Sequence, residues 1–418
     1  MNRNLLLWKI AKRIIPTGNS FLSKNPSRFH NSNWPIYFSK SKGCVVWDLN
    51  KKKYYDFSYM GVGTNILGYS DKYVDNAVIK NIKKGNMTTL NCPEEVFLSK
   101  KLIKIHFWAD MVRYARTGAE ANSIAIRLAR AFTKKNKVII CGYHGWHDWY
   151  LSENLKKKNY LDTHLFPSLK TEGVPKQLRK LTYSMLYNDL DRLNEIISKD
   201  KDIACLIMEV ERDQKPKDNY LKEIRNICSK NRIVLIFDEC TTGFRETYGG
   251  IHLKYKVYPD MAMFGKAIGN GYAITAILGR KSIMKCAENT FMSSTFWSER
   301  IGFTAAIAVL DKMKKTKSWL KVKNKGIFIK NQLRKISKKN DLKIKISGLD
   351  SLIRFEFLNI RNKNFFYKEF INQMLKKGFL ASNVLYLSIS HTSKLIKLYL
   401  KSFDQTLKII NVKNLRNN

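Results

Sequence analysis

Short apolar runs alternate with longer helical or irregular stretches through the middle of the chain. The runs are MVRYA (111–115), VIIC (138–141), LTYS (181–184), IACLIM (203–208) and IVLIF (233–237). Continuous runs rich in β-branched residues are typical of strands that are buried on both faces, as in parallel sheets. The alternation therefore predicts an α/β domain in which one mainly parallel sheet carries helices on its faces.

The flanking segments have other patterns. Residues 34–58 hold two strand-like runs, CVVWDL and KYYDFS, with a lysine-rich turn between them, which predicts a peripheral hairpin. Helical patterns follow at 72–84 and 94–106, and Pro93 stands where a helix start favours proline.

The last part of the chain begins with helical patterns, first SERIGFTAAIAVLDKMKK and then a lysine-rich helix. It continues with strands near IKISG and LIRFEF, a helix near 365–376, the segment FLASNVLYLSISHT and a last helix from about 393. We therefore expect an N-terminal helix and hairpin segment (1–60) packing on the body, a large α/β domain (61–300) and a small α+β domain (301–418).

The N-terminal MNRNLLLWKIAKRIIPTGNS has an apolar core of only LLLW before lysine and arginine resume. This core is too short for a signal peptide or a membrane span. It indicates an amphipathic helix that packs on the body, with an organellar presequence as the alternative.

The formal net charge of the 418 residues is +42, which would suit a nucleic-acid or anionic-membrane partner. However, only 19 of the 76 basic residues are arginine, the residue that makes bidentate contacts to phosphates and bases. The lysines are spread along the chain, which is typical of solvated faces. We predict no dedicated nucleic-acid partner and no membrane partner.

The chain has seven cysteines and no C-x-x-C pair. An odd number without paired spacing argues against a disulfide framework and against a zinc site. It indicates a reducing, cytoplasmic compartment, and no metal site is predicted.

One lysine has an unusual setting. Lys266 lies between an apolar run, MAMF (261–264), and a turn with glycines at 265, 269 and 271. The run reads as a buried strand, and the glycines allow the backbone to approach a ligand. Desolvation would lower the pKa of the amine and leave it free for Schiff-base chemistry. A solvated loop lysine is the alternative.

A carboxylate that could act together with Lys266 follows the strand-like run IVLIF. Asp238 and Glu239 follow it, at the end of a parallel strand where ligands of α/β sheets bind. Pyridoxal 5'-phosphate requires a lysine for its aldehyde and a carboxylate that keeps its ring nitrogen protonated. Lys266 and Asp238 fit these two roles, so we predict this cofactor.

Six motifs occur in the order that one known family has: MGVGTNILGYSD (60–71), TGAEANSIAIRLAR (117–130), YHGWHDW (143–149), DECTTGFR (238–245), FGKAIGNGY (264–272) and STFWSERIGFTAA (294–306). The chain resembles the class III, fold-type I aminotransferases over nearly its whole length, and within them glutamate-1-semialdehyde 2,1-aminomutase and its relatives. The resemblance implies a large domain with a seven-stranded type of sheet, a smaller C-terminal domain, and a homodimer with its active site at the interface.

The resemblance also assigns roles around the cofactor. Gly118 and Ala119 would hold the phosphate at a helix amino terminus, where backbone amides bind anions; an ordinary capped helix start is the alternative. Tyr143 would cover one face of the ring, with His144 close behind, the alternatives being a core aromatic and a satisfied histidine. For Glu120 we favour a first-turn dipole role.

Two further positions follow from the family. Glu209, at the end of IACLIM, would lie near the cofactor, with Arg245 as the cation between the acids or as a structural partner of one of them. Thr295 would reach the phosphate from the neighbouring subunit. A helix cap by Ser294 or Ser298 is the competing interpretation of that stretch.

The implied reaction is amino-group transfer on a small amino or carbonyl substrate. The first hypothesis is an aminomutase, which moves the amine within one molecule. The second is an intermolecular transaminase that acts on another carbonyl, such as a sugar or polysaccharide precursor; Trp146 and Trp149, where the aminomutase has smaller residues, favour it. A binding protein on a degenerate enzyme scaffold is disfavoured because Lys266 and Asp238 are both present. For Cys240, where a branched apolar residue is expected, we predict only packing.

Overall fold

The computed structural model describes residues 3–29, 33–156, 160–164 and 169–416. The chain forms two compact units: residues 76–315 make one, and residues 1–75 together with 316–418 make the other. The boundaries therefore fall at 75 and 315, where 60 and 300 were expected. The N-terminal hairpin belongs with the C-terminal segment because strand β3 pairs in parallel with β13.

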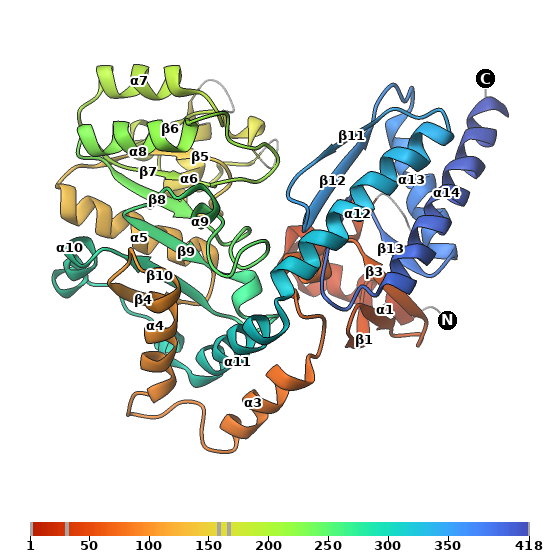
Figure 1. Ribbon diagram of the computed structural model, residues 1–418, viewed down its shortest axis with the longest axis horizontal. Coiled ribbons are helices and arrows are strands. Elements are labelled where there is room, and N and C mark those ends of the chain that lie inside the picture. The colour runs from red at the N-terminus through yellow and green to blue at the C-terminus, as the bar shows by residue number, and fades with distance from the viewer. Residues whose placement is uncertain (1–2, 30–32, 157–159, 165–168, 417–418) are drawn as a thin grey trace. The chain divides into compact units, whose positions relative to one another are not determined.

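The unit of residues 76–315, called the large unit below, contains a seven-stranded sheet of order β4-β10-β9-β8-β7-β5-β6 (Figure 1). Its strands are β4 (Met111–Ala115), β5 (Lys137–Cys141), β6 (Thr182–Ser184), β7 (Ile203–Met208), β8 (Val234–Asp238), β9 (Met261–Phe264) and β10 (Thr275–Gly279). All strands predicted from the apolar runs are confirmed. Every residue of β7, β8 and β9 is buried, as the continuous apolar runs require.

The direction of the strands decides where their ends meet. Strands β6, β5, β7, β8 and β9 are parallel, and β10 runs antiparallel to both β9 and β4. Strand β4 therefore has the direction of β9. The segments that follow β4, β5, β7, β8 and β9 all leave the sheet at one edge, which is where an open α/β sheet binds ligands.

The large unit also contains helices. They are α4 (Pro93–Ile105), α5 (Gly118–Thr133), α6 (Asp148–Leu151), α7 (Leu190–Lys199), α8 (Tyr220–Lys230), α9 (His252–Tyr255), α10 (Lys281–Met284) and α11 (Arg300–Thr316). Of these, α4, α5, α8 and α10 contact strands of the sheet. Helix α5 packs against β4, β7, β8, β9 and β10 through a face of alanine, isoleucine and leucine. Helix α4 begins at Pro93, as predicted.

The other unit contains two small sheets, of order β1-β2-β3-β13 and β11-β12-β14. Its strands are β1 (Phe38–Lys42), β2 (Val45–Asp48), β3 (Lys53–Phe57), β11 (Ile344–Ser347), β12 (Leu352–Phe357), β13 (Phe379–Ala381) and β14 (Val384–Tyr386). Its helices are α1 (Arg3–Ile14), α2 (Met60–Gly63), α12 (Ser318–Lys339), α13 (Lys363–Lys376) and α14 (Ser393–Arg416), and α3 (Lys72–Ile82) crosses the boundary. The predicted hairpin is confirmed as the antiparallel pair β2 and β3, and β1 extends it.

Candidate active site

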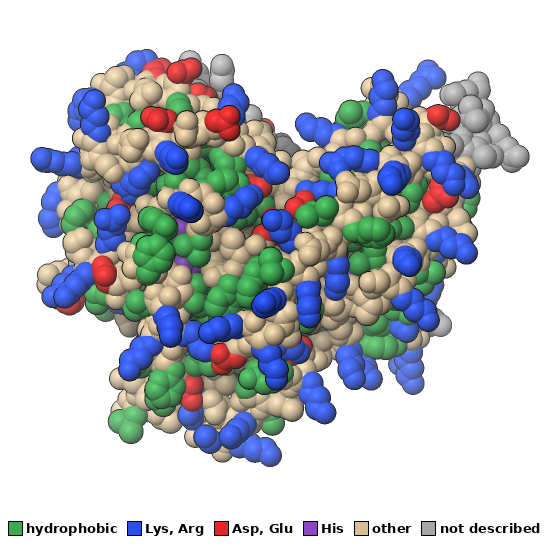
Figure 2. Space-filling view, viewed as in Figure 1, with side chains coloured by type: hydrophobic (Ala, Val, Ile, Leu, Met, Phe, Trp, Pro, Cys, Tyr) green, Lys and Arg blue, Asp and Glu red, His purple; other side chains and the backbone are tan. Residues whose placement is uncertain are grey.

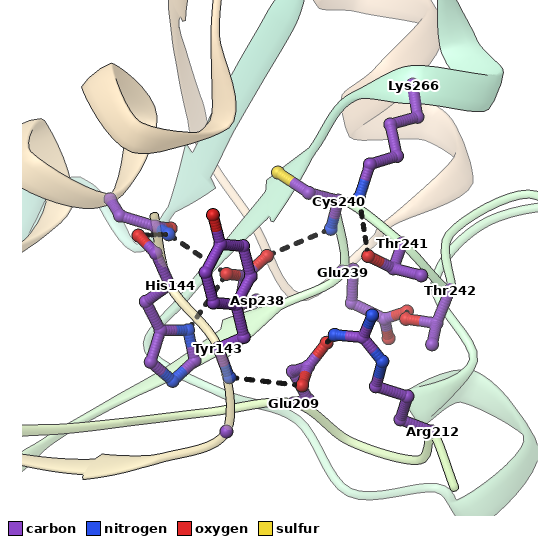
Figure 3. A network of polar contacts seen from close by, with 12 residues as sticks. Tyr143, His144, Glu209, Arg212, Asp238, Glu239, Cys240, Thr241, Thr242 and Lys266 are labelled. Carbon is purple, nitrogen blue, oxygen red and sulfur yellow. Dashed lines mark hydrogen bonds and ion pairs between the residues drawn. The ribbon is translucent and has the colours of Figure 1, made fainter. Parts of the chain in front are cut away.

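The carboxyl edge of the large sheet brings most of the predicted site residues together. Figure 3 shows Tyr143 and His144 after β5, Glu209 after β7, Asp238 at the end of β8 and Lys266 after β9 around one space. Strand direction alone explains this convergence, because these strands are parallel neighbours or near neighbours in the sheet.

Asp238 is buried at the end of β8, with 5% of its surface exposed. Its Oδ2 accepts hydrogen bonds from Nδ2 of Asn122 and Nδ1 of His144, each at 2.9 Å, and its Oδ1 accepts from the amide of Cys240 at 3.1 Å. Burial opposes ionisation, but these donors prevail and hold the pKa of Asp238 below its usual value. The carboxylate is therefore ionised at neutral pH.

His144 is fixed by the same contact. Because an ionised carboxylate only accepts, Nδ1 of His144 carries the hydrogen, and the ring has 1% of its surface exposed. Among the described residues, Nε2 of His144 has no hydrogen-bond partner. Asn122, on α5, also donates to the carbonyl of His144 at 2.9 Å, so one amide holds both the aspartate and the histidine.

Lys266 follows β9 in the first turn of a 3-10 helix, Lys266–Ile268. Its backbone has φ of 44°, in the left-handed region that costs free energy for a residue with a side chain. The side chain is half-buried, and Nζ donates to Oγ1 of Thr241 at 2.7 Å. Desolvation and the nearby charge of Arg212 lower the pKa of Lys266, which is the condition that amine chemistry requires.

The start of α5 lies at the same edge. Thr117 and Glu120 form a capping box: the amide of Glu120 donates to Oγ1 of Thr117 at 3.3 Å, and the amide of Thr117 donates to Oε2 of Glu120 at 2.8 Å. Glu120 thus caps the helix instead of facing a substrate. The next amides, of Gly118 and Ala119, have no carbonyl one turn earlier in the helix and are open to an anion.

The YHG segment packs directly on this helix start. A Cβ at Gly145, which has φ of 110°, would lie 2.7 Å from Cβ of Ala119. Only glycine allows this approach, so Gly145 places Tyr143 and His144 beside the open amides.

Glu209 has a different partner from the one expected. Its Oε1 accepts from Nη1 of Arg212 at 2.7 Å, and its Oε2 accepts from the amide of Tyr143 at 3.3 Å. The cation beside Glu209 is thus Arg212, three residues later in the chain, whereas Arg245 was expected. Arg245 is 1% exposed and donates Nε to the carbonyl of Thr241.

The structure adds three residues that the sequence did not point out as site residues: Asn122, Arg212 and Thr241. Asn122 is a polar residue on the otherwise apolar face of α5, and this exception to the pattern is a signal that could have identified it. Arg212 and Thr241 lie in irregular loops, where no periodic pattern distinguishes one polar residue from another.

Cys240 fills the space between the helix start and the lysine turn. A side chain added at Gly118 would come within 3.3 Å of its Sγ, and one at Gly265 within 3.4 Å. Burial raises the pKa of the Cys240 thiol well above its usual value, and Asp238 adds to the effect. The thiol is therefore neutral and acts by packing.

Thr295 begins the 3-10 helix Thr295–Ser298, which lies beside the start of α5, because Nε1 of Trp297 donates to Oε1 of Glu120 at 3.1 Å and Arg116 donates to the carbonyl of Trp297 at 3.1 Å. Neither Ser294 nor Ser298 caps α11, because the amides of Ile301 and Gly302 donate instead to the carboxylate of Glu299 at 2.9 and 3.0 Å. The prediction that Ser294 or Ser298 caps this helix is therefore wrong. The side chain of Thr295 is exposed.

The described residues indicate neither a metal site nor a membrane-spanning helix. They contain no cluster of histidine, cysteine and acidic side chains that could hold a metal ion. None of the helices described is both long enough and apolar enough to cross a membrane. Figure 2 shows lysine and arginine side chains scattered over the face in view, as the sequence interpretation predicts.

The residues at the sheet edge fit pyridoxal phosphate. They supply an ionised buried carboxylate for a ring nitrogen, an amine of lowered pKa for an aldehyde, and open amides at a helix amino terminus for a phosphate. These three groups come from strands and a helix that share one edge.

Comparisons with known proteins lead to the same chemistry. The family model "Aminotransferase class-III" matches residues 28–404. Curated relatives include a glutamate-1-semialdehyde 2,1-aminomutase from Nitrosopumilus maritimus, 32% identical, with 97% of this chain and 99% of that protein covered. A 3-aminobutyryl-CoA aminotransferase from Cloacimonas acidaminovorans is 33% identical, with 83% of this chain and 81% of that protein covered.

Solved structures share the fold. The FumI protein of Sphingopyxis sp. MTA144, in its PLP form, superposes with a TM-score of 0.88 at 23% identity, covering 99% of this chain and 98% of that one. A glutamate-1-semialdehyde aminomutase from Pseudomonas aeruginosa PAO1 superposes with a TM-score of 0.83 at 16% identity, covering 97% of this chain and 94% of that one. At these identities the likeness shows the fold alone.

Proposed function

We propose, since this chain belongs to the class III aminotransferase family and is a pyridoxal-phosphate enzyme, that it is an aminomutase of the glutamate-1-semialdehyde kind. Amino-group transfer is the shared chemistry of the family, and the aminomutase is the finer assignment. The relative that shares 32% identity over 97% of this chain supports this assignment.

Lys266 is the residue that would bind the cofactor aldehyde. Its amine is half-buried, has a lowered pKa and is oriented by Oγ1 of Thr241. Once the substrate amine has taken its place, Nζ is free to act as a base. It would carry a proton between a carbon of the substrate and the carbon of the cofactor that takes up the amine, which is the proton movement that amino transfer requires.

Asp238 would hold the ring nitrogen in its protonated form. Pyridoxal phosphate, when bound, supplies an electron sink that stabilises negative charge on the substrate carbon. Asp238 can maintain that state because Asn122 and His144 keep its carboxylate ionised and oriented. The pairing of this buried carboxylate with the amine of Lys266 at one sheet edge is the observation that carries the amino-transfer chemistry, and the relative that is 32% identical over 97% of this chain carries the finer aminomutase assignment.

The remaining predicted residues would complete the cofactor site. Gly118 and Ala119 would give their open amides to the phosphate, and Tyr143 would cover one face of the ring. Glu209 would lie at the rim, where its charge is balanced by Arg212 at 2.7 Å.

Thr295 would reach the phosphate of a second copy, so the working form would be a homodimer with its active sites at the interface. Two adjacent segments of the large unit support this: the amide of Arg300 donates to the carbonyl of Asn86 at 3.1 Å. Both segments expose large apolar side chains, Leu90 at 81%, Phe291 at 87% and Phe296 at 65%. Apolar side chains gathered in this way are typical of a protein interface.

Sedimentation velocity tests the homodimer. The wild-type chain should sediment as a dimer, and the double variant Leu90→Glu/Phe296→Glu should sediment as a monomer with weakened cofactor binding. A wild-type monomer with full activity would contradict the interface site.

The aminomutase reaction has a direct test. Purified, cofactor-loaded protein is supplied with glutamate-1-semialdehyde alone, and 5-aminolaevulinate is measured. The proposal predicts product without any added amine donor, because the amine moves within one molecule. A loaded protein that forms none would contradict it.

An intermolecular transaminase is the second candidate. The 33% identical 3-aminobutyryl-CoA aminotransferase and the exposed Trp146 in YHGWHDW favour it. Its acceptor would be another carbonyl compound, such as a sugar or polysaccharide precursor. It predicts turnover only when both an amine donor and a separate carbonyl acceptor are present, so a panel of donor and acceptor pairs separates the two candidates.

A cytoplasmic location accords with the cysteines. All seven are free thiols, and the buried ones, such as Cys205 and Cys228, have a pKa raised to about 12 by desolvation. Thiols kept reduced are typical of the cytoplasm.

A further inference from the structure

A second buried network lies directly beside the site, and the proposed chemistry makes no use of it. Glu239 follows Asp238 but turns away from it, with none of its surface exposed. Its carboxylate accepts four hydrogen bonds: from Nδ1 of His252 at 2.8 Å, from the amides of Ile251 and His252 at 3.0 Å, and from Oγ1 of Thr242 at 2.5 Å. A buried carboxylate with four donors is ionised, and the pKa of Glu239 is lowered although burial opposes this.

These bonds close a loop. The loop of residues 239–252 begins at Glu239, just after β8, and ends at His252, which bonds to the carboxylate of Glu239. Glu239 therefore joins the two ends of the loop. His252 is fixed in turn because its Nε2 accepts from Nε1 of Trp108 at 2.9 Å. With Nδ1 donating and Nε2 accepting, His252 is a neutral ring in a single tautomer.

The loop is held in a conformation that it would not adopt alone. Phe244 is fully buried with φ of 61°, in the left-handed region, and its amide donates to the carbonyl of Gly249 at 2.7 Å. A Cβ at Gly250 would lie 2.3 Å from Nδ1 of His252 and 2.8 Å from Oε1 of Glu239. Strain of this kind persists only where surrounding contacts determine the backbone.

The loop carries Thr241, whose Oγ1 accepts from Nζ of Lys266 at 2.7 Å (Figure 3). The carbonyl of Thr241 accepts from Nε of the buried Arg245, which holds the residue from its other side. Thr241, which is part of the strained loop, thus connects the loop to the reactive amine.

We propose that Glu239 is a positioning residue for Lys266: by closing the loop 239–252 onto His252, it sets the hydroxyl of Thr241 against the amine of Lys266. Glu239 does not touch the reacting atoms in this account. It acts through Thr241, so removing Glu239 should change the lysine in the same direction as removing the hydroxyl itself.

The test uses the apoprotein and measures how fast it captures pyridoxal 5'-phosphate across a range of pH, followed as visible absorbance. The midpoint of the pH profile reports the ionisation of Lys266. Thr241→Val should move it to lower pH, because the ammonium form loses its acceptor, by roughly half a pH unit or more. Glu239→Gln should move the midpoint in the same direction. Glu239→Asp keeps the carboxylate and should move the midpoint less than Glu239→Gln does.

The double variant gives the sharpest result. If Glu239 acts through Thr241, Glu239→Gln should cause no further shift when Thr241→Val is already present, because coupled residues are not additive. Independent, additive shifts would overturn the proposal, as would a Glu239→Gln midpoint that equals the wild-type value. A role limited to stability would lower the melting temperature and leave the midpoint unchanged, which also contradicts the proposal.

Three further variants keep the test decisive. If Glu239→Gln does not fold, Trp108→Phe loosens the far end of the network and should shift the midpoint less, in the same direction; an unchanged midpoint would overturn the proposal. Asp200→Asn is the matched control, since it removes the ion pair with Lys137 at 2.5 Å, at the start of β5 and so at the opposite edge of the sheet, and should leave the midpoint unchanged. Lys266→Ala separates this proposal from the lysine assignment: undiminished capture by that variant would refute the lysine role itself.

Discussion

His144 donates Nδ1–H to Oδ2 of Asp238 across 2.9 Å, and both side chains are buried. The contact links the segment after β5 to the end of β8, two strands away in the sheet. It keeps the aspartate ionised in a place where burial alone would favour the neutral acid. The chemistry of the site depends on that ionised state.

Replacing Asp238 by asparagine keeps the shape of the side chain and removes its charge. We expect turnover to fall about 100-fold or more, because a preorganised charge at the reacting centre is lost. Activity measured at saturating cofactor checks this. His144→Phe should cause a smaller loss, since Asn122 and the amide of Cys240 remain as donors. Activity of Asp238→Asn within threefold of wild type would refute the role of the charge.

The ion pair of Glu209 and Arg212 should also set the state of Lys266. The charge of Arg212 lowers the pKa of Lys266, so Arg212→Met should raise that pKa and slow cofactor capture by the apoprotein at neutral pH. The charge of Glu209, left buried without Arg212, would also raise the pKa of Lys266. Arg212→Lys is the matched control, because it preserves the charge. Faster capture by Arg212→Met would contradict this reading of the charges.

Much of this arrangement could be predicted from the sequence, for reasons that differ between residues. Asp238 and Lys266 each follow a continuous apolar run, and such runs locate the ends of buried strands well. Arg212 could not be predicted, because a charged loop residue three positions after Glu209 looks like any solvated arginine. The joining of β3 with β13 was also not predictable, since short strands more than 300 residues apart carry no pattern that identifies their partner.

The stability of the large unit should fall between pH 7 and pH 5 because of His106. Desolvation lowers the pKa of the buried His106 to about 3, whereas an unfolded histidine titrates near 6.5. The unfolded chain therefore binds the proton first, and the stability present above pH 6.5 is lost as the pH falls. We expect His106 to contribute about 2 kcal/mol to the loss between pH 7 and pH 5.

Urea unfolding at the two pH values measures this contribution. The variant His106→Gln cannot titrate, so its loss of unfolding free energy should be smaller than that of wild type by about 2 kcal/mol. Equal losses in both proteins would show that His106 is not buried as a neutral ring.

The central claim is that the cofactor is attached to Lys266, one of 57 lysines in the chain. Loaded protein is reduced with borohydride, which makes a lysine-bound cofactor permanent, then digested and analysed by mass spectrometry. We predict the added mass on the peptide that contains Lys266, with no such peptide from Lys266→Ala. Stoichiometric attachment at a different lysine, or its persistence in the variant, would contradict the account.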